Sequence, residues 1–342
     1  MTLGRQPWLH AEPAPDPDDP LWSRAALDHG ADLAVLGHRL RVRTNAPGLL
    51  ALARETFGRF APAGTDRPGL DLALIAGASA PVPASSAVGP PRHREHGGLF
   101  VADDGTGSLV AADLGGGRAR AFIGPSARPE AVRAVVLEAT AYRFVTWHGL
   151  TALHAAGLVV DGQSLVLRGA GGAGKTTLAY AAARAGHTVL ADEVVWWDRA
   201  DRCLRGTPWW LRLEPEATAV FPELDAVPPA ARAQGGPKRV VDAAASGFRT
   251  IERAPAGPVV ILEQTVRRPV ASAWRRLRAH EARAAFQASL IVGERAQPAS
   301  GLTAALEALL AERAYGLVAG APDGAVAALE AIARDARSAA PS

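Results

Sequence analysis

One stretch of this sequence restricts the fold more than any other. Residues 169–176 read Gly-Ala-Gly-Gly-Ala-Gly-Lys-Thr and match the phosphate-binding (Walker A) pattern G-x-x-x-x-G-K-[ST] at every fixed position. A short apolar run, residues 164–167, precedes the loop, and an alanine-rich segment, residues 177–185, follows it. The pattern therefore predicts a buried strand, a tight glycine-rich loop and a helix in direct succession.

Each residue type in this loop suits the binding of a nucleotide phosphate. Glycines let successive backbone N–H groups turn inward around the anion, and the following helix adds the positive end of its dipole. The loop residues expected to bind ATP are Gly169, Gly171, Gly172, Ala173, Gly174, Lys175, Thr176 and Thr177. Lys175 would reach the β- and γ-phosphates, and the Thr176 hydroxyl would take a Mg²⁺ position.

The use of lysine supports this interpretation against that of an ordinary glycine-rich turn. Of the 37 basic residues only Lys175 and Lys238 are lysines, so the chain uses arginine almost everywhere else. A compact ammonium group kept in the loop therefore indicates chemistry that requires one.

An acidic pair follows the next apolar segment. Residues 188–191 are Thr-Val-Leu-Ala, and Asp192 and Glu193 come directly after them. In phosphate-loop proteins a carboxylate at the end of such a strand holds Mg²⁺ or serves as base to the attacking hydroxyl. We expect Thr176, Asp192 and Glu193 to be the metal ligands.

Composition excludes several classes of protein. The chain has 342 residues, 48% of them hydrophobic and 21% charged, which is ordinary for a globular protein of two domains. The arginines are scattered and the formal net charge is only +3, so nucleic-acid binding is not expected. Cys203 is the only cysteine, which excludes an intrachain disulfide. With no signal-peptide pattern and no long apolar run, we expect a cytoplasmic protein without a membrane span.

The segment before the loop is predicted to hold a flexible arm and a small domain. Residues 1–24 are rich in Pro, Asp and Trp and predict the arm. Residues 25–128 predict an α+β domain: a half-exposed strand over 32–44, a helix from Pro47, and strands over 70–76, 99–102, 108–112 and 119–123. His93 and His96 lie in a predicted loop, 77–98, and without an acidic or cysteine partner nearby we expect a solvated loop there rather than a metal site.

The predicted catalytic domain covers residues 129–342. A helix from Pro129 to about residue 149 is expected to pack against the nucleotide-binding sheet. Strands are predicted over 153–161, 259–263 and 314–319, and helices over 301–313 and 325–337. The pairs Trp196–Trp197 and Trp209–Trp210 predict a β-hairpin with cross-strand aromatic pairs. Five arginines within 267–278 predict a solvated face, with phosphate or acidic-substrate contact as the alternative.

Three of these segments together resemble the catalytic domain of the HPr kinase/phosphorylase family. They are Leu153-His154-Ala155-Ala156-Gly157, the phosphate loop, and residues 186–193. The resemblance implies an α/β fold: a P-loop kinase domain related to phosphoenolpyruvate carboxykinase, preceded by a smaller α+β domain. It also implies that His154 lies near the transferred phosphate and that Asp192 is the base toward a serine hydroxyl. The catalytic residues would then be His154, Lys175 and Asp192, although a lone histidine at a strand start also fits a structural role.

The chain departs from the family pattern in the region that recognises the acceptor. Glu193 stands where the family has a second aspartate, and Thr176 where it usually has serine. The family's Glu-Ile-Arg-Gly segment is missing, and Trp209-Trp210-Leu211-Arg212-Leu213-Glu214 occupies that region. The chain therefore resembles the branch of HPr-kinase-like proteins that act on other acceptors, including serines of small ribosomal peptides.

These patterns favour an ATP-dependent kinase that phosphorylates a serine or threonine of a peptide or small protein. A small-molecule kinase, for free serine or a metabolite, and a non-enzymatic nucleotide-binding switch or scaffold stay open. Arg212, Arg239 and Glu263 are further candidates because they lie at or beside strands expected to converge on the loop. The sequence does not decide the oligomeric state, so a homo-oligomer stays open.

Overall fold

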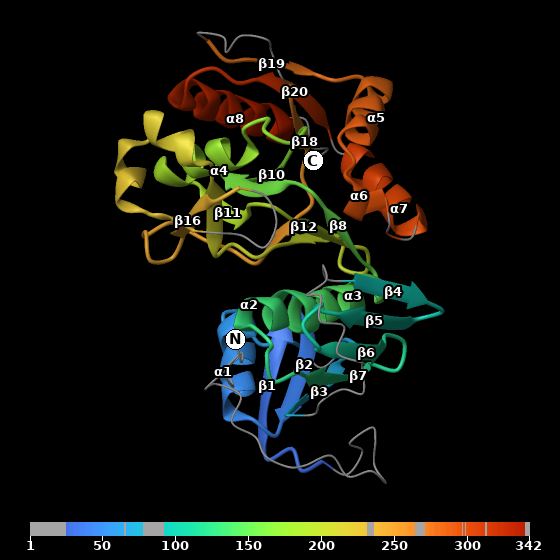
Figure 1. The fold of residues 1–342 in the computed structure, drawn as a ribbon. Helices are drawn as coiled ribbons and strands as arrows, with labels where there is room; N and C mark the ends of the chain where they lie inside the picture. The colour runs from blue at the N-terminus through green and yellow to red at the C-terminus, as the bar shows by residue number, and fades with distance from the viewer. Residues whose placement is uncertain are drawn as a thin grey trace. The chain divides into compact units, whose positions relative to one another are not determined.

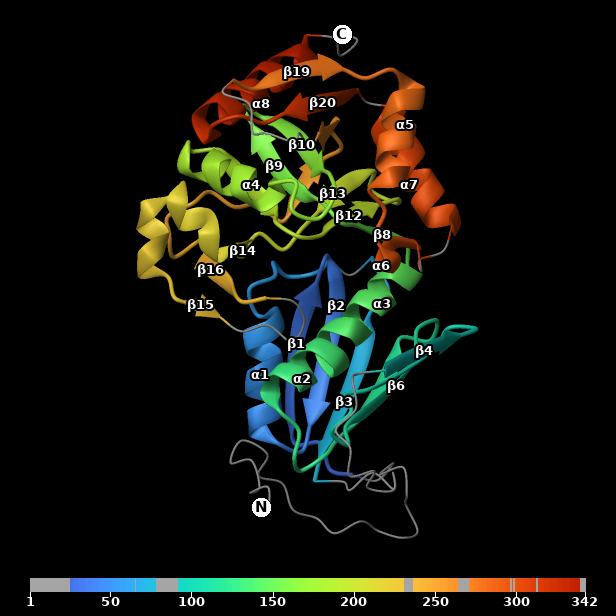
Figure 2. The same cartoon turned by 45° about the horizontal axis from the view of Figure 1, so that its top comes forward.

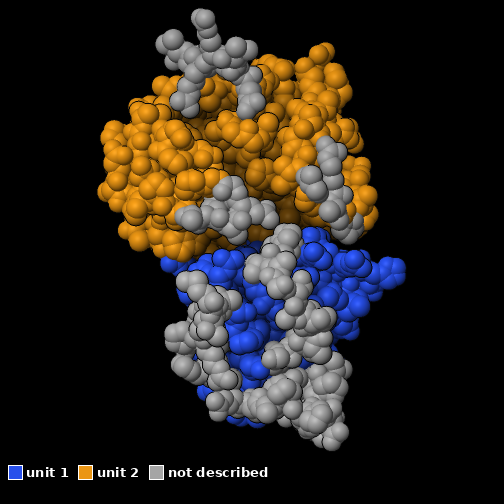
Figure 3. Space-filling view, viewed as in Figure 1, with its two compact units in different colours: residues 1–148 blue, residues 149–342 orange. Residues whose placement is uncertain are grey.

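The computed structural model describes two compact units, coloured separately in Figure 3. The first spans residues 1–148 and the second residues 149–342, and both are mixed α/β (Figures 1 and 2). The described residues are 25–64, 66–77, 92–230, 236–263, 271–295, 297, 299–311 and 313–338. The arm predicted for 1–24 lies outside them. Within these ranges no helix has the length and apolar character needed to cross a bilayer.

The first unit is built on a seven-stranded sheet of order β1-β2-β3-β7-β6-β5-β4. Neighbours β2, β3 and β7 run parallel, and the other pairs are antiparallel. The strands are β1 (His29–Val35), β2 (His38–Thr44), β3 (Leu70–Ala76), β4 (Arg92–His96), β5 (Leu99–Asp103), β6 (Leu109–Asp113) and β7 (Arg118–Ile123). In β2 the buried residues Leu40 and Val42 alternate with exposed arginines, because successive side chains point to opposite faces.

Two predictions for this unit need correction. Residues 32–44 form a hairpin and not one strand, since Leu36 and Gly37 adopt φ values of 49° and 83° and reverse the chain between β1 and β2. His93 and His96 lie on β4, which pairs with β5, and not in a loop; both are exposed. The rest of the predicted loop, residues 78–91, lies outside the described residues.

The helix over residues 129–147 lies in the first compact unit, which ends at residue 148, whereas the sequence predicts a domain boundary at 128. It consists of α2 (Pro129–Ala131), η2 (Val132–Glu138) and α3 (Ala139–Trp147), and it crosses strands β2 and β3 in Figure 2. Phe144 packs edge-on against His38 of β2, with ring centroids 5.8 Å apart. The predicted packing of this helix against the nucleotide-binding sheet is therefore wrong: it packs on the sheet of the first unit, because helical periodicity shows an apolar stripe but not which sheet the stripe contacts.

α1 (Pro47–Phe57) also packs in this unit, as the sequence predicts. Pro47 starts the helix at a position where its missing N–H costs nothing, and Leu49, Ala53 and Phe57 are buried.

The second unit is organised around a six-stranded sheet of order β11-β9-β10-β18-β20-β19. Strands β10, β18 and β20 are parallel neighbours at its centre, and the remaining pairs are antiparallel. The strands are β9 (Ala156–Val160), β10 (Gln163–Arg168), β11 (Thr188–Ala191), β18 (Val259–Leu262), β19 (Ala273–Arg276) and β20 (Ala314–Val318).

Both faces of this central sheet are covered. Leu165 and Leu167 of β10 pack with α4 (Lys175–Arg184) and α8 (Pro322–Arg337). Val166 points the other way, into a core shared with α5 (Ala279–Ala288) and α7 (Ala299–Ala311) and with a second, four-stranded sheet. That sheet has the order β17-β13-β12-β8: Arg253–Pro255, Cys203–Arg205, Val195–Asp198 and Leu150–Leu153. Burial on both faces explains why the strand reads as a continuous apolar run.

The strand predicted over 153–161 is two strands. β8 ends at Leu153 and joins the four-stranded sheet, whereas β9 begins at Ala156 and joins the six-stranded sheet. His154 therefore lies in the link between two sheets. The turn predicted at Asp161-Gly162 is confirmed, with φ values of 49° and 80°.

The predicted hairpin around residues 198–202 is confirmed, because β12 pairs antiparallel with β13, but the predicted cross-strand tryptophan pairs are wrong. Trp196 and Trp197 of β12 face Arg205 and Leu204 of β13, and Trp210 begins β14 (Trp210–Leu213) in a third sheet with β16 (Lys238–Asp242) and β15 (Pro229–Ala230). The chain changes sheet at Gly206, where a Cβ atom would lie 2.0 Å from the Leu190 oxygen. Only glycine permits this close approach, because any other residue would place its Cβ against that oxygen.

The α4/α8 layer should carry much of the stability of the second unit. Leu329 of α8 is fully buried in that core, and Leu329→Ala should lower the unfolding free energy by about 3 kcal/mol, because the substitution leaves a cavity. Urea unfolding followed by circular dichroism measures this, with Ala327→Lys on the exposed side of α8 as the control. Equal losses in both variants would contradict the assigned core.

Candidate active site

The glycine-rich loop connects the centre of the six-stranded sheet to the N-terminus of α4. β10 ends at Arg168 and α4 begins at Lys175, as the sequence predicts. Gly174, which precedes the helix, has a φ of 92°, a left-handed conformation that favours glycine. A Cβ on Gly169 would lie 3.1 Å from the Leu262 oxygen, so the loop passes tightly against β18. Its backbone path is therefore dictated by the glycines.

Lys175 lies in the concave side of this loop. Its ammonium donates hydrogen bonds to the carbonyl oxygens of Gly169, at 2.9 Å, and Ala170, at 3.2 Å. Burial and the nearby Arg168 lower the pKa of Lys175, while Asp192 acts in the opposite direction. A cation is thus held among partly desolvated groups, where an anion would bind it strongly.

Asp192 follows β11 and is almost fully buried, with 3% of its surface exposed. Its Oδ2 accepts a 2.7 Å hydrogen bond from the backbone N–H of Arg212, whereas its buried Oδ1 accepts none from the described residues. Burial raises the pKa of this carboxyl to about 6, although the nearby Thr176 hydroxyl and the Arg212 N–H oppose the shift. An oxygen left unpaired beside a hydroxyl is the arrangement that a hard cation or a proton would complete.

Glu193 and Arg212 lie at the same edge. The Arg212 guanidinium forms a 3.4 Å ion pair with the half-buried Glu193 carboxylate, while the Arg212 backbone N–H donates to Asp192. Arg239, also singled out in the sequence, instead donates hydrogen bonds to the carbonyl oxygens of Leu224 (2.9 Å) and Val227. Its Nε also donates to the Pro215 oxygen at 3.4 Å, so Arg239 connects the short helices η3 (Pro215–Ala219) and η4 (Pro222–Ala226).

His154 joins this group from the link between β8 and β9. It is half-buried, and burial together with the Lys175 charge lowers its pKa, so the ring is neutral at pH 7. Its backbone N–H donates a 2.9 Å hydrogen bond to Glu294. The structure thus brings together His154, Lys175, Thr176, Asp192 and Glu193, which the sequence proposed separately.

Two charged residues of the site were missed in the sequence. Arg168, the last residue of β10, is fully buried and pairs with the buried Glu294 of α6 (Val292–Arg295) at 2.7 Å. A charged residue ending an apolar strand directly before the loop could have drawn attention to Arg168. Glu294 lies 126 residues further on, so no local pattern connects the two.

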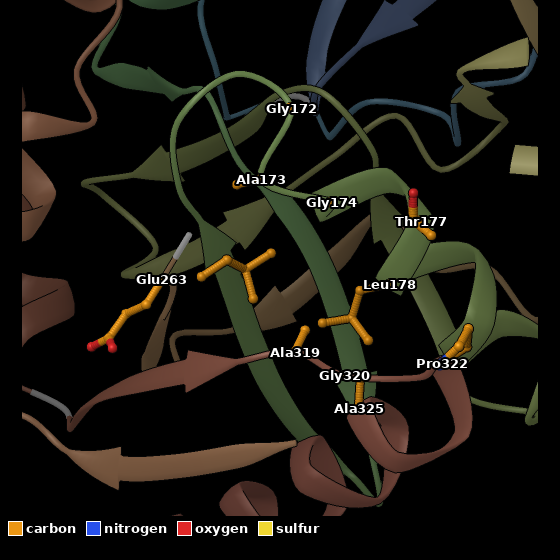
Figure 4. A pocket seen from close by; sticks show the side chains of 11 residues that line it. Gly172, Ala173, Gly174, Thr177, Leu178, Glu263, Ala319, Gly320, Pro322 and Ala325 are labelled. Atoms are coloured by element: carbon orange, nitrogen blue, oxygen red, sulfur yellow. The ribbon is translucent and has the colours of Figure 1, made fainter. Parts of the chain in front are cut away.

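A pocket of about 460 Å³ opens beside the loop and the start of α4 (Figure 4). Leu178, Ala319 and Ala325 gather on one side of it, and Glu263 lies on the other, paired with Arg275 at 3.2 Å. The full lining is Gly172, Ala173, Gly174, Thr177, Leu178, Leu262, Glu263, Ala319, Gly320, Pro322 and Ala325. The pocket thus has a mixed polar and apolar lining and shares three residues with the loop.

Asp198, Asp201 and Cys203 form another group of close polar atoms, but arginines already neutralise it. Arg205 pairs with Asp198 at 2.6 Å and with Asp201 at 2.7 Å, and Arg253 donates to the Cys203 sulfur at 3.2 Å. We assign no metal to this group.

Comparison with known proteins finds likeness to solved structures only, and at low sequence identity. No protein-family model matches the chain, and no curated protein matches it significantly. Among solved structures, the HPr(Ser) kinase/phosphatase from Coxiella burnetii is 14% identical, covering 55% of this chain and 96% of its own, with a TM-score of 0.28. A TM-score this low does not establish a shared fold, so function is argued below from the geometry of the site.

The buried Asp192 carboxyl makes a testable contribution to stability. Because its pKa in the folded state is raised to about 6, the folded protein binds the proton more tightly than the unfolded one, and stability falls as pH rises from about 4 to 6. Asp192→Asn removes this penalty, so at pH 7 the variant should be more stable than the parent by up to about 3 kcal/mol. Urea unfolding in magnesium-free buffer between pH 4 and 7 measures the difference.

Asp335→Asn is the matched control. Arg276 lowers the pKa of the Asp335 carboxyl, so this group contributes stability above its unfolded pKa and loses it as pH falls. Its removal should change the pH dependence in the opposite direction. A parent and an Asp192→Asn variant with parallel pH profiles would contradict the assigned burial.

Proposed function

We propose that this protein is an ATP-dependent kinase that transfers the γ-phosphoryl group to a serine or threonine hydroxyl of a peptide or small protein. One observation carries the proposal: Lys175 and the buried Asp192 carboxylate, whose Oδ1 has no hydrogen-bond partner among the described residues, lie together at the glycine loop and the N-terminus of α4. An anion-binding loop, a cation and an acid with a raised pKa are the parts that phosphoryl transfer requires. The proposal includes a P-loop kinase architecture for the second unit and a cytoplasmic location, where ATP is available.

The loop and Lys175 would bind the triphosphate. The loop N–H groups and the positive end of the α4 dipole face the same space. Lys175 now donates to two loop carbonyl oxygens and would exchange these bonds for the β- and γ-phosphate oxygens. Since the ammonium is already partly desolvated, little further cost is expected when the anion arrives.

The residues present fit a magnesium ion. Asp192 Oδ1 is buried without a partner among the described residues, and the Thr176 hydroxyl and the Glu193 carboxylate complete a set of oxygen donors. These three residues would hold Mg²⁺, which prefers such ligands together with phosphate oxygens. When bound, the ion would neutralise charge on the phosphate oxygens.

Asp192 would accept the proton of the attacking hydroxyl. The acceptor oxygen bonds to the γ-phosphorus, the bond from that phosphorus to the β–γ bridging oxygen breaks, and ADP leaves with the electron pair. The Asp192 carboxylate would be ionised at neutral pH and would take up the proton as the acceptor oxygen bonds to phosphorus. His154, neutral and close to Lys175, would lie beside the transferred group.

The pocket beside the loop would hold the nucleoside. It begins at Gly172, Gly174 and Thr177, where a chain of phosphates bound in the loop would end, and Leu178, Ala319 and Ala325 offer an apolar surface for a base. Its volume of about 460 Å³ is within the range of small-ligand sites.

Ala319→Trp tests this pocket separately from the loop. The larger side chain should fill the pocket and weaken ATP binding by about tenfold or more, equivalent to about 1.4 kcal/mol, while leaving tripolyphosphate binding unchanged. Calorimetric titrations of ATP and tripolyphosphate, each with Mg²⁺, measure both. Equal weakening of the two ligands would place the nucleoside elsewhere or indicate damage to the loop.

The kinase proposal is tested with γ-labelled ATP and Mg²⁺ against serine-containing peptides, small proteins and free serine. Lys175→Ala and Asp192→Asn should each lower transfer by at least about 100-fold, because each removes charge stabilisation or proton acceptance from the transition state. Lys238→Ala is the matched control, because it removes the second of the two lysines, which lies outside the site.

The acceptor that becomes labelled decides between the remaining alternatives. Labelling of free serine alone would assign a small-molecule kinase. Tight ATP binding without transfer to any acceptor would favour a nucleotide-binding switch, and failure to bind ATP would overturn the proposal.

A further inference from the structure

Arg168 is fully buried, and all three nitrogens of its guanidinium donate hydrogen bonds within the protein. Its Nη1 and Nη2 donate to the two carboxylate oxygens of Glu294 at 2.7 and 3.0 Å, and its Nε donates to the Ser289 hydroxyl at 2.8 Å. The guanidinium also lies over the Phe286 ring, 3.9 Å from the centroid. Because Arg168 directly precedes Gly169, the first residue of the loop is attached to this assembly.

Glu294 uses its carboxylate to hold two backbone groups as well. Oε1 accepts from the backbone N–H of His154 and Oε2 from that of Ile291, both at 2.9 Å. Although burial acts in the opposite direction, the Arg168 charge and these N–H groups lower the pKa of Glu294. The carboxylate is therefore ionised at neutral pH, with four named hydrogen bonds.

The same segment holds β8 at a second point. The side-chain amide of Gln297 donates to the Ala152 oxygen at 2.7 Å and accepts from the Ala152 N–H at 2.8 Å. Gln297 thus binds the backbone of Ala152 in β8, and Glu294 binds the backbone of His154, two residues further on, in the link between the two sheets. His154 lies in that link, outside the hydrogen bonding of either sheet.

A buried ion pair of this kind is weak evidence for stability. Its desolvation cost can exceed the attraction between the charges, and apolar residues of similar volume often stabilise as well or better. What apolar residues cannot do is accept the His154 N–H and bind the strand that leads into the loop at the same time. The ion pair is therefore better suited to positioning these backbone segments than to stabilising the fold.

We propose that Glu294, anchored by Arg168, is a positioning residue that sets His154 against the phosphate loop. This inference rests on the proposed function and adds to it: the ion pair acts on phosphoryl transfer through the place of His154, and not on nucleotide binding. Removing it should leave the loop able to bind ATP but misplace His154 relative to the γ-phosphate.

The test is a mutant cycle that needs no identified acceptor. MgATP binding is measured by calorimetry, and transfer by single-turnover release of inorganic phosphate to water. The variants are the pair Arg168→Met with Glu294→Leu, which removes both charges together, His154→Ala, and all three combined. Glu294→Gln is a further variant, which leaves Arg168 charged and unpaired and is the one more exposed to misfolding.

The ion-pair variant should release phosphate about 100-fold more slowly at unchanged ATP affinity, because misplacement of a group by about 1 Å costs this much. In the His154→Ala background it should cause no further loss, since both changes remove one effect. Arg205→Met with Asp198→Leu, which removes a buried ion pair of the neighbouring sheet, should match the parent. Additive losses, or a loss of ATP affinity in the ion-pair variant, would overturn the inference.

Hydrogen exchange separates this inference from the proposed function. If the parent neither binds ATP nor releases phosphate, the proposed function fails, and amide exchange across residues 153–156 decides the positioning role. In the ion-pair variant, amide hydrogen exchange should be faster across residues 153–156 and unchanged in α4. Equal exchange at 153–156 in parent and variant would overturn the positioning role.

Discussion

Burial of β10 on both faces is the constraint on which the second unit depends. Leu165 and Leu167 face one core and Val166 the other, so no charged side chain can lie along the strand without a partner. Charge appears only at its end, where Arg168 meets Glu294 and the chain turns into the glycine loop. The polar chemistry of the unit is thus concentrated where the apolar layers stop, at the carboxyl end of the parallel strands, where α/β sheets commonly bind ligands.

The titratable groups at this edge lie in surroundings that disfavour their charged forms. Burial lowers the pKa of Lys175 and of His154 and raises that of Asp192, so in each case the charged form is disfavoured. Asp192 keeps one buried oxygen without a partner among the described residues. Proteins commonly retain such costs at functional sites, where a ligand or a proton relieves them. The contrast is with Asp198 nearby, whose charge is neutralised by Arg205 within the protein.

Local elements of the second unit were predictable because their causes are local. The strand, loop and helix over 163–184 follow from an apolar run, glycines and an alanine-rich segment, and the position of Asp192 after β11 follows from the next apolar run. Predictions failed where a distant surface decides. The helix over 129–147 is amphipathic in either domain. Trp196 and Trp197 of β12 and Trp210 of β14 belong to different sheets, and Gly206 between them packs directly against the Leu190 oxygen, a contact that no local pattern predicts.

The functional groups available at the loop are fixed by the order of residues in the chain: the ammonium, the hydroxyl and the two carboxylates can all be assigned without the structure. How these groups stand to one another depends on the packing of distant segments. Packing places His154 in a link between two sheets, buries Asp192 Oδ1 without a hydrogen-bond partner among the described residues, and joins Arg168 to Glu294 across 126 residues. The physical reason is that burial and hydrogen-bond partnership are properties of packed surfaces, whereas periodicity and turn chemistry report only on a residue's neighbours in the chain.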